Sequence, residues 1–192
     1  MTPILYTPKR YYCPLRLVDV PSAWQGCAII LADILDRFRV KRETCLEFGV
    51  EHGYSTAALS NFFQRVVAVD WFGGDTLYGY CDPVEREAST RATLSKFPNV
   101  QVVAQKFEDF APTCDQQCDF CHIDIEHTYE TTLACGLWAV EHAPVVIFHD
   151  TKSYPAVLKA ITEISNLTGM YCYDWPEPDG CCGLGILSRE AL

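Results

Sequence analysis

The stretch LEFGVEHGYST, residues 46–56, decides the fold. Residues 44–48 predict a short strand, 49–53 a glycine turn and 55–63 a helix. Directly after them, residues 65–70 form an apolar run that ends in a carboxylate, which is typical of a strand buried in a parallel sheet. A strand, a tight turn, a helix and a second strand make one βαβ unit.

The same alternation continues toward the C-terminus. Further strands are predicted at 100–104, 120–124 and 144–149, and helices at 83–97, 129–141 and 154–167. Two last strands, 170–174 and 184–188, follow each other without a helix and predict a hairpin. We therefore expect an α/β fold: a doubly wound, mostly parallel, seven-stranded Rossmann-like sheet closed by an antiparallel C-terminal hairpin.

The N-terminal part lies outside this alternation. Residues 1–21 carry four prolines without a clean period and predict an irregular arm. Ser22 is expected to cap a helix that runs to about Arg39. The arm, this helix and the core at 44–188 are expected to form a single domain, because 192 residues suit one sizeable core.

Composition restricts the partners and the compartment. The formal net charge of -10 disfavours a nucleic-acid partner, because an acidic protein repels phosphate backbones. No segment approaches the ~20 apolar residues of a membrane span, and the N-terminus has no signal-peptide pattern, so we expect a cytoplasmic protein without a membrane partner. A homo-oligomer is an open alternative, since the arm at 1–21 could lie on a partner.

Eleven cysteines are many for such a chain. Only Cys118 and Cys121 have the paired spacing of a zinc site, which needs four ligands, so most cysteines are expected to be small buried apolar residues. Cys181 and Cys182, in a loop rich in Gly and Pro, could be exposed and oxidisable.

The glycine turn is the first candidate binding element, because ligands of open α/β sheets bind beyond the carboxyl ends of the strands. Gly49 and Gly53 allow a tight bend and a close approach of the backbone to a ligand. Ser55 or Thr56 at the start of the helix would add donors, and Glu47 suits a cationic group such as the amine of an amino acid. The turn lacks the G-x-G-x-x-G pattern of dinucleotide sites. A tight turn without a ligand is the alternative.

Asp70 ends the second strand, where a carboxylate can accept the hydroxyl hydrogens of a ribose. Trp71 and Phe72 could then pack on an adenine face. Glu108, after the third strand, is a weaker candidate for a contact to the adenine or its loop. The alternatives are a helix cap for Asp70 and a solvated surface acid for Glu108.

Two segments that follow apolar strands predict a reaction centre between residues 124 and 150. Asp124 lies in HIDIEHTYE, residues 122–130, and His149 and Asp150 lie in VVIFHDT, residues 145–151. If these strands are parallel neighbours, the three side chains converge and can hold a divalent cation, with oxygen ligands that favour Mg²⁺ or Mn²⁺.

A proton acceptor is expected beside this centre. His127 could remove a proton from a metal-bound hydroxyl, since an imidazole titrates near neutral pH, and Glu126 is the rival for that role. The alternative is that Asp124 and Asp150 cap the following helices while the two histidines are satisfied by backbone groups.

Together these motifs resemble the class I S-adenosylmethionine-dependent methyltransferases. The resemblance is carried by LEFGVEHGYST (46–56), VVAVDWFGGD (66–75), FCHIDIEHTYE (120–130) and VVIFHDT (145–151). More narrowly, they look like the branch of sugar and macrolide O-methyltransferases and cephalosporin-hydroxylase-like proteins. The Gly-Gly usual before the fifth strand is replaced by His142-Ala143-Pro144, and His149 stands where a further acidic metal ligand often lies.

The resemblance implies a role for each motif. The methionine-binding turn would contain Glu47, Gly49 and Gly53, and the ribose acid would be Asp70. The metal-binding acids would be Asp124 and Asp150, and Asp124 would also contact the cofactor. The general base would be His127 or Glu126.

The function expected on these grounds is methyl transfer from S-adenosylmethionine to a hydroxyl of a small molecule, such as a sugar or an aromatic ring. Aromatic side chains that could line its pocket are Trp71, Phe72, Tyr78, Tyr80 and Tyr154. Two other classes stay open: a non-catalytic binding or assembly protein on the same scaffold, and a nicotinamide-dependent oxidoreductase, which the missing third glycine disfavours.

Overall fold

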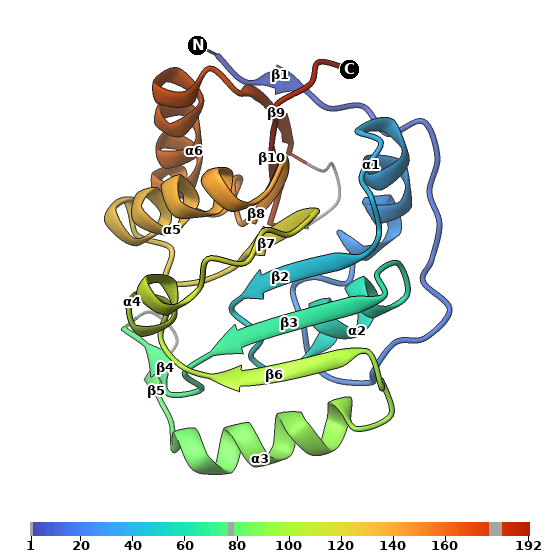
Figure 1. Ribbon diagram of the computed structural model, residues 1–192, viewed down its shortest axis with the longest axis vertical. Coiled ribbons are helices and arrows are strands. Elements are labelled where there is room, and N and C mark those ends of the chain that lie inside the picture. The colour runs from blue at the N-terminus through green and yellow to red at the C-terminus, as the bar shows by residue number, and fades with distance from the viewer. Residues whose placement is uncertain (1, 77–78, 177–181) are drawn as a thin grey trace.

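The computed structural model describes residues 2–76, 79–176 and 182–192. Its centre is an eight-stranded sheet in the order β1-β9-β10-β8-β7-β2-β3-β6 (Figure 1). The strands are β1 (Ile4–Leu5), β2 (Thr44–Phe48), β3 (Arg65–Asp70), β6 (Val100–Ala104), β7 (Phe120–Ile123), β8 (Val145–His149), β9 (Tyr171–Trp175) and β10 (Leu184–Ser188). Strands β6, β3, β2, β7 and β8 are parallel, while β10 runs antiparallel to β8 and β9. The mostly parallel sheet with its C-terminal hairpin is confirmed.

The eighth strand comes from the N-terminal arm, which was expected to be irregular throughout. Ile4 and Leu5 pair in parallel with Tyr173 and Asp174 at the edge of the sheet. Pro3 stands directly before the strand and cannot donate to the ladder, and the Tyr6 amide donates to the Asp174 carbonyl oxygen just after it. Two further short strands, β4 (Gly74–Asp75) and β5 (Gly79–Tyr80), form a separate hairpin after β3.

The helices are α1 (Leu31–Arg37), α2 (Tyr54–Ser60), α3 (Pro83–Leu94), α4 (Phe107–Phe110), α5 (Tyr129–His142) and α6 (Pro155–Thr168), with short 3₁₀ turns at Ala28–Ile30 and Ala111–Thr113. The predicted start of the first helix at Ser22 is wrong, whereas α1 ends at Arg37, close to the predicted end at about Arg39. The Ser22 hydroxyl accepts the Trp24 amide in a local turn, and the buried Trp24 side chain turns the chain into the core before α1 begins.

The helix α2 ends three residues before its predicted end at residue 63. The Asn61 side-chain amide donates to the carbonyl oxygens of Ala57 and Ala58, which closes the last turn. The helix α3 also stops early, at Leu94 rather than residue 97, and Pro98 follows shortly after it.

Side chains alternate across the sheet into two cores. Along β2, Cys45 faces the core that holds α1 and α2, whereas Leu46 and Phe48 face the core that holds α5 and α6. Both faces of the sheet are therefore covered, as the helices on either side of the strands show in Figure 1. The loops at the carboxyl ends of the strands remain to build a site.

Most of the described cysteines are buried, as the sequence predicts. The buried ones are Cys27, Cys45, Cys118, Cys121, Cys135 and Cys172. The ligand-type cluster found among the described residues contains none of them, so the paired spacing of Cys118 and Cys121 reflects burial. Cys182 is half-buried, and Cys181 lies outside the described residues. In the part of the chain that the structure describes, every helix is too short or too polar to cross a bilayer.

Candidate active site

The glycine turn, residues 49–53, joins β2 to α2 and needs both of its glycines. Gly49 and Gly53 have φ of 88° and 87°, a left-handed backbone that other residues rarely adopt. A Cβ at Gly49 would lie 1.9 Å from the carbonyl oxygen of Asp124, and one at Gly53 would lie 3.0 Å from the Leu94 side chain. The tight bend is as predicted. The space that a side chain would fill, however, is taken by the protein itself rather than left for a ligand.

Asp70, at the end of β3, fastens the glycine turn. Its Oδ2 accepts the amides of Val50 at 2.7 Å and Glu51 at 2.9 Å, and its Oδ1 accepts the amide of Phe72 at 2.7 Å. It therefore caps a turn and not a helix. A carboxylate has about four acceptor positions, so roughly one remains for a ribose hydroxyl, where the sequence argument expected two.

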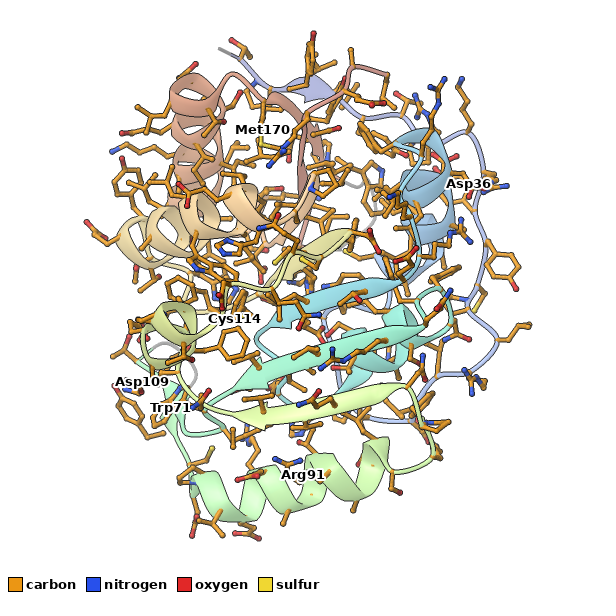
Figure 2. The ribbon with its side chains drawn as sticks, viewed as in Figure 1. Asp36, Trp71, Arg91, Asp109, Cys114 and Met170 are labelled. Atoms are coloured by element: carbon orange, nitrogen blue, oxygen red, sulfur yellow. The ribbon has the colours of Figure 1, made fainter. Side chains whose placement is uncertain are left out.

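The two aromatic residues after Asp70 take different places. Phe72 is 1% exposed and packs in the core on the α1 and α2 side, so its predicted contact with adenine is wrong. Its φ is 61°, a left-handed backbone that is uncommon for an aromatic residue. Trp71 stays half-exposed beside the carboxyl ends of β3 and β6 (Figure 2). Lys106 lies 4.5 Å from its ring, and the exposed Tyr80 meets it edge-on.

Glu47 is fully buried and does not reach the surface where a ligand could meet it. One carboxylate oxygen accepts the Thr56 hydroxyl, and the other lies 3.0 Å from His122 Nδ1. Thr56 is thus a partner of Glu47 and not a free donor at the helix start. Ser55 is 6% exposed, next to it on α2.

Four side chains from two neighbouring strand ends converge, and we call them the acid–imidazole cluster: Asp124, His127, His149 and Asp150. His127 Nε2 lies 2.7 Å from Asp150 Oδ2 and 3.2 Å from Asp124 Oδ1. His149 Nδ1 lies 2.8 Å from Asp150 Oδ2 and 3.4 Å from Asp124 Oδ2. The predicted convergence of Asp124, His149 and Asp150 is therefore found, and His127 joins them.

The donor set of this cluster fits a divalent cation. Ligand atoms of Asp124, His127 and Asp150 lie within 4.8 Å of one another. Two carboxylates and an imidazole suit Mg²⁺ less well than oxygens alone, and suit Mn²⁺ or a similar ion well. His127, expected as a base, thus lies where a ligand would lie, beside or instead of His149.

The acids and imidazoles of the cluster stabilise one another's charged forms. Burial disfavours the ionised form of Asp150, but hydrogen bonds with His127 and His149 outweigh it and lower its pKa to about 2. For Asp124, burial is likewise outweighed by both histidines, and the pKa falls well below its usual value. Burial opposes a charge on His127, yet hydrogen bonds with Asp124 and Asp150 raise its pKa to about 9.

The structure rules out helix capping as the role of the two carboxylates. The helix α5 is capped by Thr128, whose hydroxyl accepts the Thr131 amide, and α6 begins at Pro155 after Tyr154, which makes no side-chain cap. The Tyr154 ring stacks on His127 with centroids 4.5 Å apart. Glu126, which lies between Asp124 and His127 in sequence, is half-buried.

Two other residues predicted for the site are not placed in it. Glu108 is exposed on α4, and Tyr78 falls outside the described residues. Sequence reasoning missed Trp24, which reaches His122 from the N-terminal segment, and Lys106. Glu47 and His122 are register partners on β2 and β7. The sequence signal for this pair was that each is a polar residue close to the end of an apolar strand. No sequence signal pointed to Trp24.

The sequence matches a family model described as a methyltransferase domain over residues 46–151. That range contains the glycine turn, Asp70 and the acid–imidazole cluster. Among curated proteins, none matches this chain.

Several solved structures share the fold. A cofactor-bound protein from MTB has 19% identity and a TM-score of 0.67, with 91% of this chain and 84% of that chain covered. An O-methyltransferase from Bacillus cereus in complex with SAH has 16% identity and a TM-score of 0.60, covering 88% and 82%. An rRNA methylase from Streptococcus thermophilus has 13% identity and a TM-score of 0.60, covering 90% and 99%. These likenesses show the fold and leave the substrate open.

Proposed function

Because the chain belongs to the methyltransferase-domain family, we propose that it transfers the methyl group of S-adenosylmethionine to a hydroxyl of a small molecule, assisted by a divalent cation. The observation that carries this proposal is the convergence of Asp124, His127, His149 and Asp150 beside the glycine turn. The Asp124 carbonyl itself packs on Gly49, so the two halves of the site touch.

The part of the site that would bind the cofactor consists of the backbone of the glycine turn and the carboxylate of Asp70. Asp70 fixes the amides of Val50 and Glu51 and keeps acceptor capacity for a ribose hydroxyl. The half-exposed Trp71 offers an aromatic face to an adenine, with Lys106 over the same ring system. When bound, S-adenosylmethionine supplies a sulfonium methyl that is already electrophilic, so the protein has to align a nucleophile and exclude water.

The acceptor half is the acid–imidazole cluster. Asp124 and Asp150 would hold a divalent cation, with His127 or His149 as a nitrogen ligand, and such an ion would lower the pKa of a bound hydroxyl. A cation on the two carboxylates would take over the pairing that raises the pKa of His127. The base that takes the proton would then be His127, if His149 is the ligand, or Glu126, if His127 is. Tyr154, stacked on His127, would cover one side of the substrate.

A small-molecule acceptor fits the charge of the chain better than an RNA does. The net charge is -10, and in this proposal the acceptor would bind beside the carboxylates of the cluster. An RNA methylase would have to bind a polyanion against this field.

The test is transfer of labelled methyl from S-adenosylmethionine to a panel of sugar and aromatic hydroxyls, with metal-stripped protein and with added Mg²⁺ or Mn²⁺. We expect transfer that depends on the ion and is lost in Asp124→Asn, while Asp19→Asn, an exposed acid of the arm, behaves like the wild type. Cofactor binding without transfer to any acceptor would contradict the proposal and favour a binding or assembly protein.

A further inference from the structure

A chain of buried hydrogen bonds runs beneath the glycine turn. The indole Nε1 of Trp24 lies 3.0 Å from His122 Nε2, and His122 Nδ1 lies 3.0 Å from Glu47 Oε1. The Thr56 hydroxyl donates to Glu47 Oε2. All four side chains are at most 2% exposed. Glu47 and Thr56 lie on either side of the glycine turn, on β2 and α2, whereas Trp24 comes from the N-terminal segment and His122 from β7.

The directions of these bonds are fixed by chemistry. An indole N–H can only donate, so His122 Nε2 accepts with its lone pair and the ring proton resides on Nδ1. The Nδ1–H then donates to Glu47, which receives a second bond from Thr56. Trp24 therefore selects the His122 tautomer that satisfies the buried carboxylate.

The position of the chain links it to the site. Glu47 precedes the glycine turn by two residues and Thr56 follows it by three, so their bond clasps the turn from both ends. His122 precedes Asp124 by two residues, and the Asp124 carbonyl packs on Gly49. The Trp24 ring also lies 6.1 Å from the His149 ring, centroid to centroid.

We propose that Trp24 and His122 are positioning residues that hold the glycine turn in its cofactor-binding geometry by orienting Glu47. This inference rests on the proposed function and extends it to a segment outside the matched residues 46–151. It also gives Glu47 a different role from a direct contact with the cofactor amine. The carboxylate acts through the turn that it clasps.

Trp24→Phe removes the donor but keeps most of the ring volume. Without it, Nε2 loses its partner and the His122 proton is free to occupy either nitrogen, so the bond to Glu47 is no longer enforced. Loss of one such bond should weaken binding of S-adenosylhomocysteine by about 5- to 10-fold. Thr56→Val, which removes the second bond to Glu47 at nearly constant shape, should have a similar effect.

The control is Tyr6→Phe. It also deletes a buried hydrogen bond, from Tyr6 to Asp33, but one in the N-terminal arm and α1. It should lower stability and leave the affinity for S-adenosylhomocysteine unchanged.

The experiment combines calorimetric titration with S-adenosylhomocysteine, urea unfolding and NMR on the full chain. Nitrogen-15 spectra should show His122 protonated at Nδ1 in the wild type and a changed signal in Trp24→Phe, together with faster hydrogen exchange at the Val50 and Glu51 amides. If Trp24→Phe and Thr56→Val lose stability as Tyr6→Phe does but bind with wild-type affinity, the positioning role is refuted.

The two proposals fail in different ways. A wild type that does not bind S-adenosylhomocysteine would contradict the proposed function. The exchange rates of the turn amides would still decide the inference, because unchanged exchange in Trp24→Phe means that the network does not hold the turn.

Discussion

Glu51, Phe72 and Asp150 each adopt a left-handed backbone, with φ of 50°, 61° and 68°. Among the described residues only one other non-glycine residue, Arg39, does so. Each such conformation costs on the order of 1 kcal/mol and persists where the surroundings enforce it. All three lie in the loops that follow β2, β3 and β8, so strain is concentrated in the loops around the candidate site.

Asp150 is the most informative single carboxylate, because it bonds to both histidines of the acid–imidazole cluster. Asp150→Asn keeps the shape and tolerates the positive φ, but removes the charge that would hold a cation. We expect methyl transfer to fall on the order of 100-fold while the affinity for S-adenosylhomocysteine changes little. Activity assays with added Mn²⁺, alongside calorimetry, check this. Wild-type transfer in the variant would place the metal elsewhere.

Gly49 and Gly169 provide a matched pair of substitutions. Both have positive φ, but a Cβ at Gly49 would lie 1.9 Å from the Asp124 carbonyl oxygen, while Gly169 has open space around it. Gly169→Ala should lower the free energy of unfolding by about 1 kcal/mol, and Gly49→Ala by clearly more, since a backbone segment has to move. Urea unfolding measures both, and equal losses would mean that the close approach at Gly49 is not enforced.

At the level of elements, two helix caps allow effects on stability to be distinguished from effects on activity. The helix α3 is capped by Asp82 and α5 by Thr128. Replacing either cap by alanine should lower the free energy of unfolding by about 1 kcal/mol. Only Thr128→Ala should also reduce methyl transfer, by several-fold, because Thr128 directly follows His127. Paired unfolding and activity measurements test this, and equal effects on transfer would argue against a rigid 124–128 segment.

The regular elements could be predicted from periodicity because tertiary packing agrees with the local pattern. Every strand of the parallel core was recognisable from its apolar run. The N-terminal part could not be predicted, since the two-residue strand at Ile4 and the inward turn at Trp24 depend on partners about 100 to 170 residues away. The short α4 likewise lacks a periodic pattern, being four residues long.

The places of the candidate site residues were predictable where charged side chains end or follow strands, as for Asp70, Asp124 and Asp150. It was not predictable where a role depends on which way a side chain turns. Phe72 and Trp71 are adjacent and look alike in sequence, yet one is in the core and the other is half-exposed. Glu47 likewise points to the same face of the sheet as Cys45, into the core. Its partner there, His122, is identified only by the register of β2 with β7.

At the scale of the molecule, the acid–imidazole cluster couples stability to pH. In the folded protein the pKa of His127 is raised to about 9, above its unfolded value near ~6.5, so its contribution is complete below about pH 6.5 and lost as the pH rises through 9. The pKa of Asp150 is lowered to about 2, below the unfolded value near ~3.9, so its contribution is present above about pH 4 and lost as the pH falls toward 2.

We therefore expect the metal-free protein to lose stability between about pH 6.5 and 9. Urea unfolding with a chelator present should show this loss in the wild type and a flatter profile in His127→Gln. Parallel profiles would mean that His127 does not carry the charge that the two carboxylates favour.

The sheet order brings the carboxyl ends of β3, β7 and β8, with Asp70, Asp124 and Asp150, to the same side of the molecule. The account depends on these strand ends forming both the cofactor site and the metal site. A crystal structure with S-adenosylhomocysteine and Mn²⁺, with the ion located by its anomalous signal, tests this most directly. We expect a ribose hydroxyl bonded to Asp70 and a manganese peak on Asp124 and Asp150. Ligand density away from Asp70, or manganese bound to neither carboxylate, would contradict it.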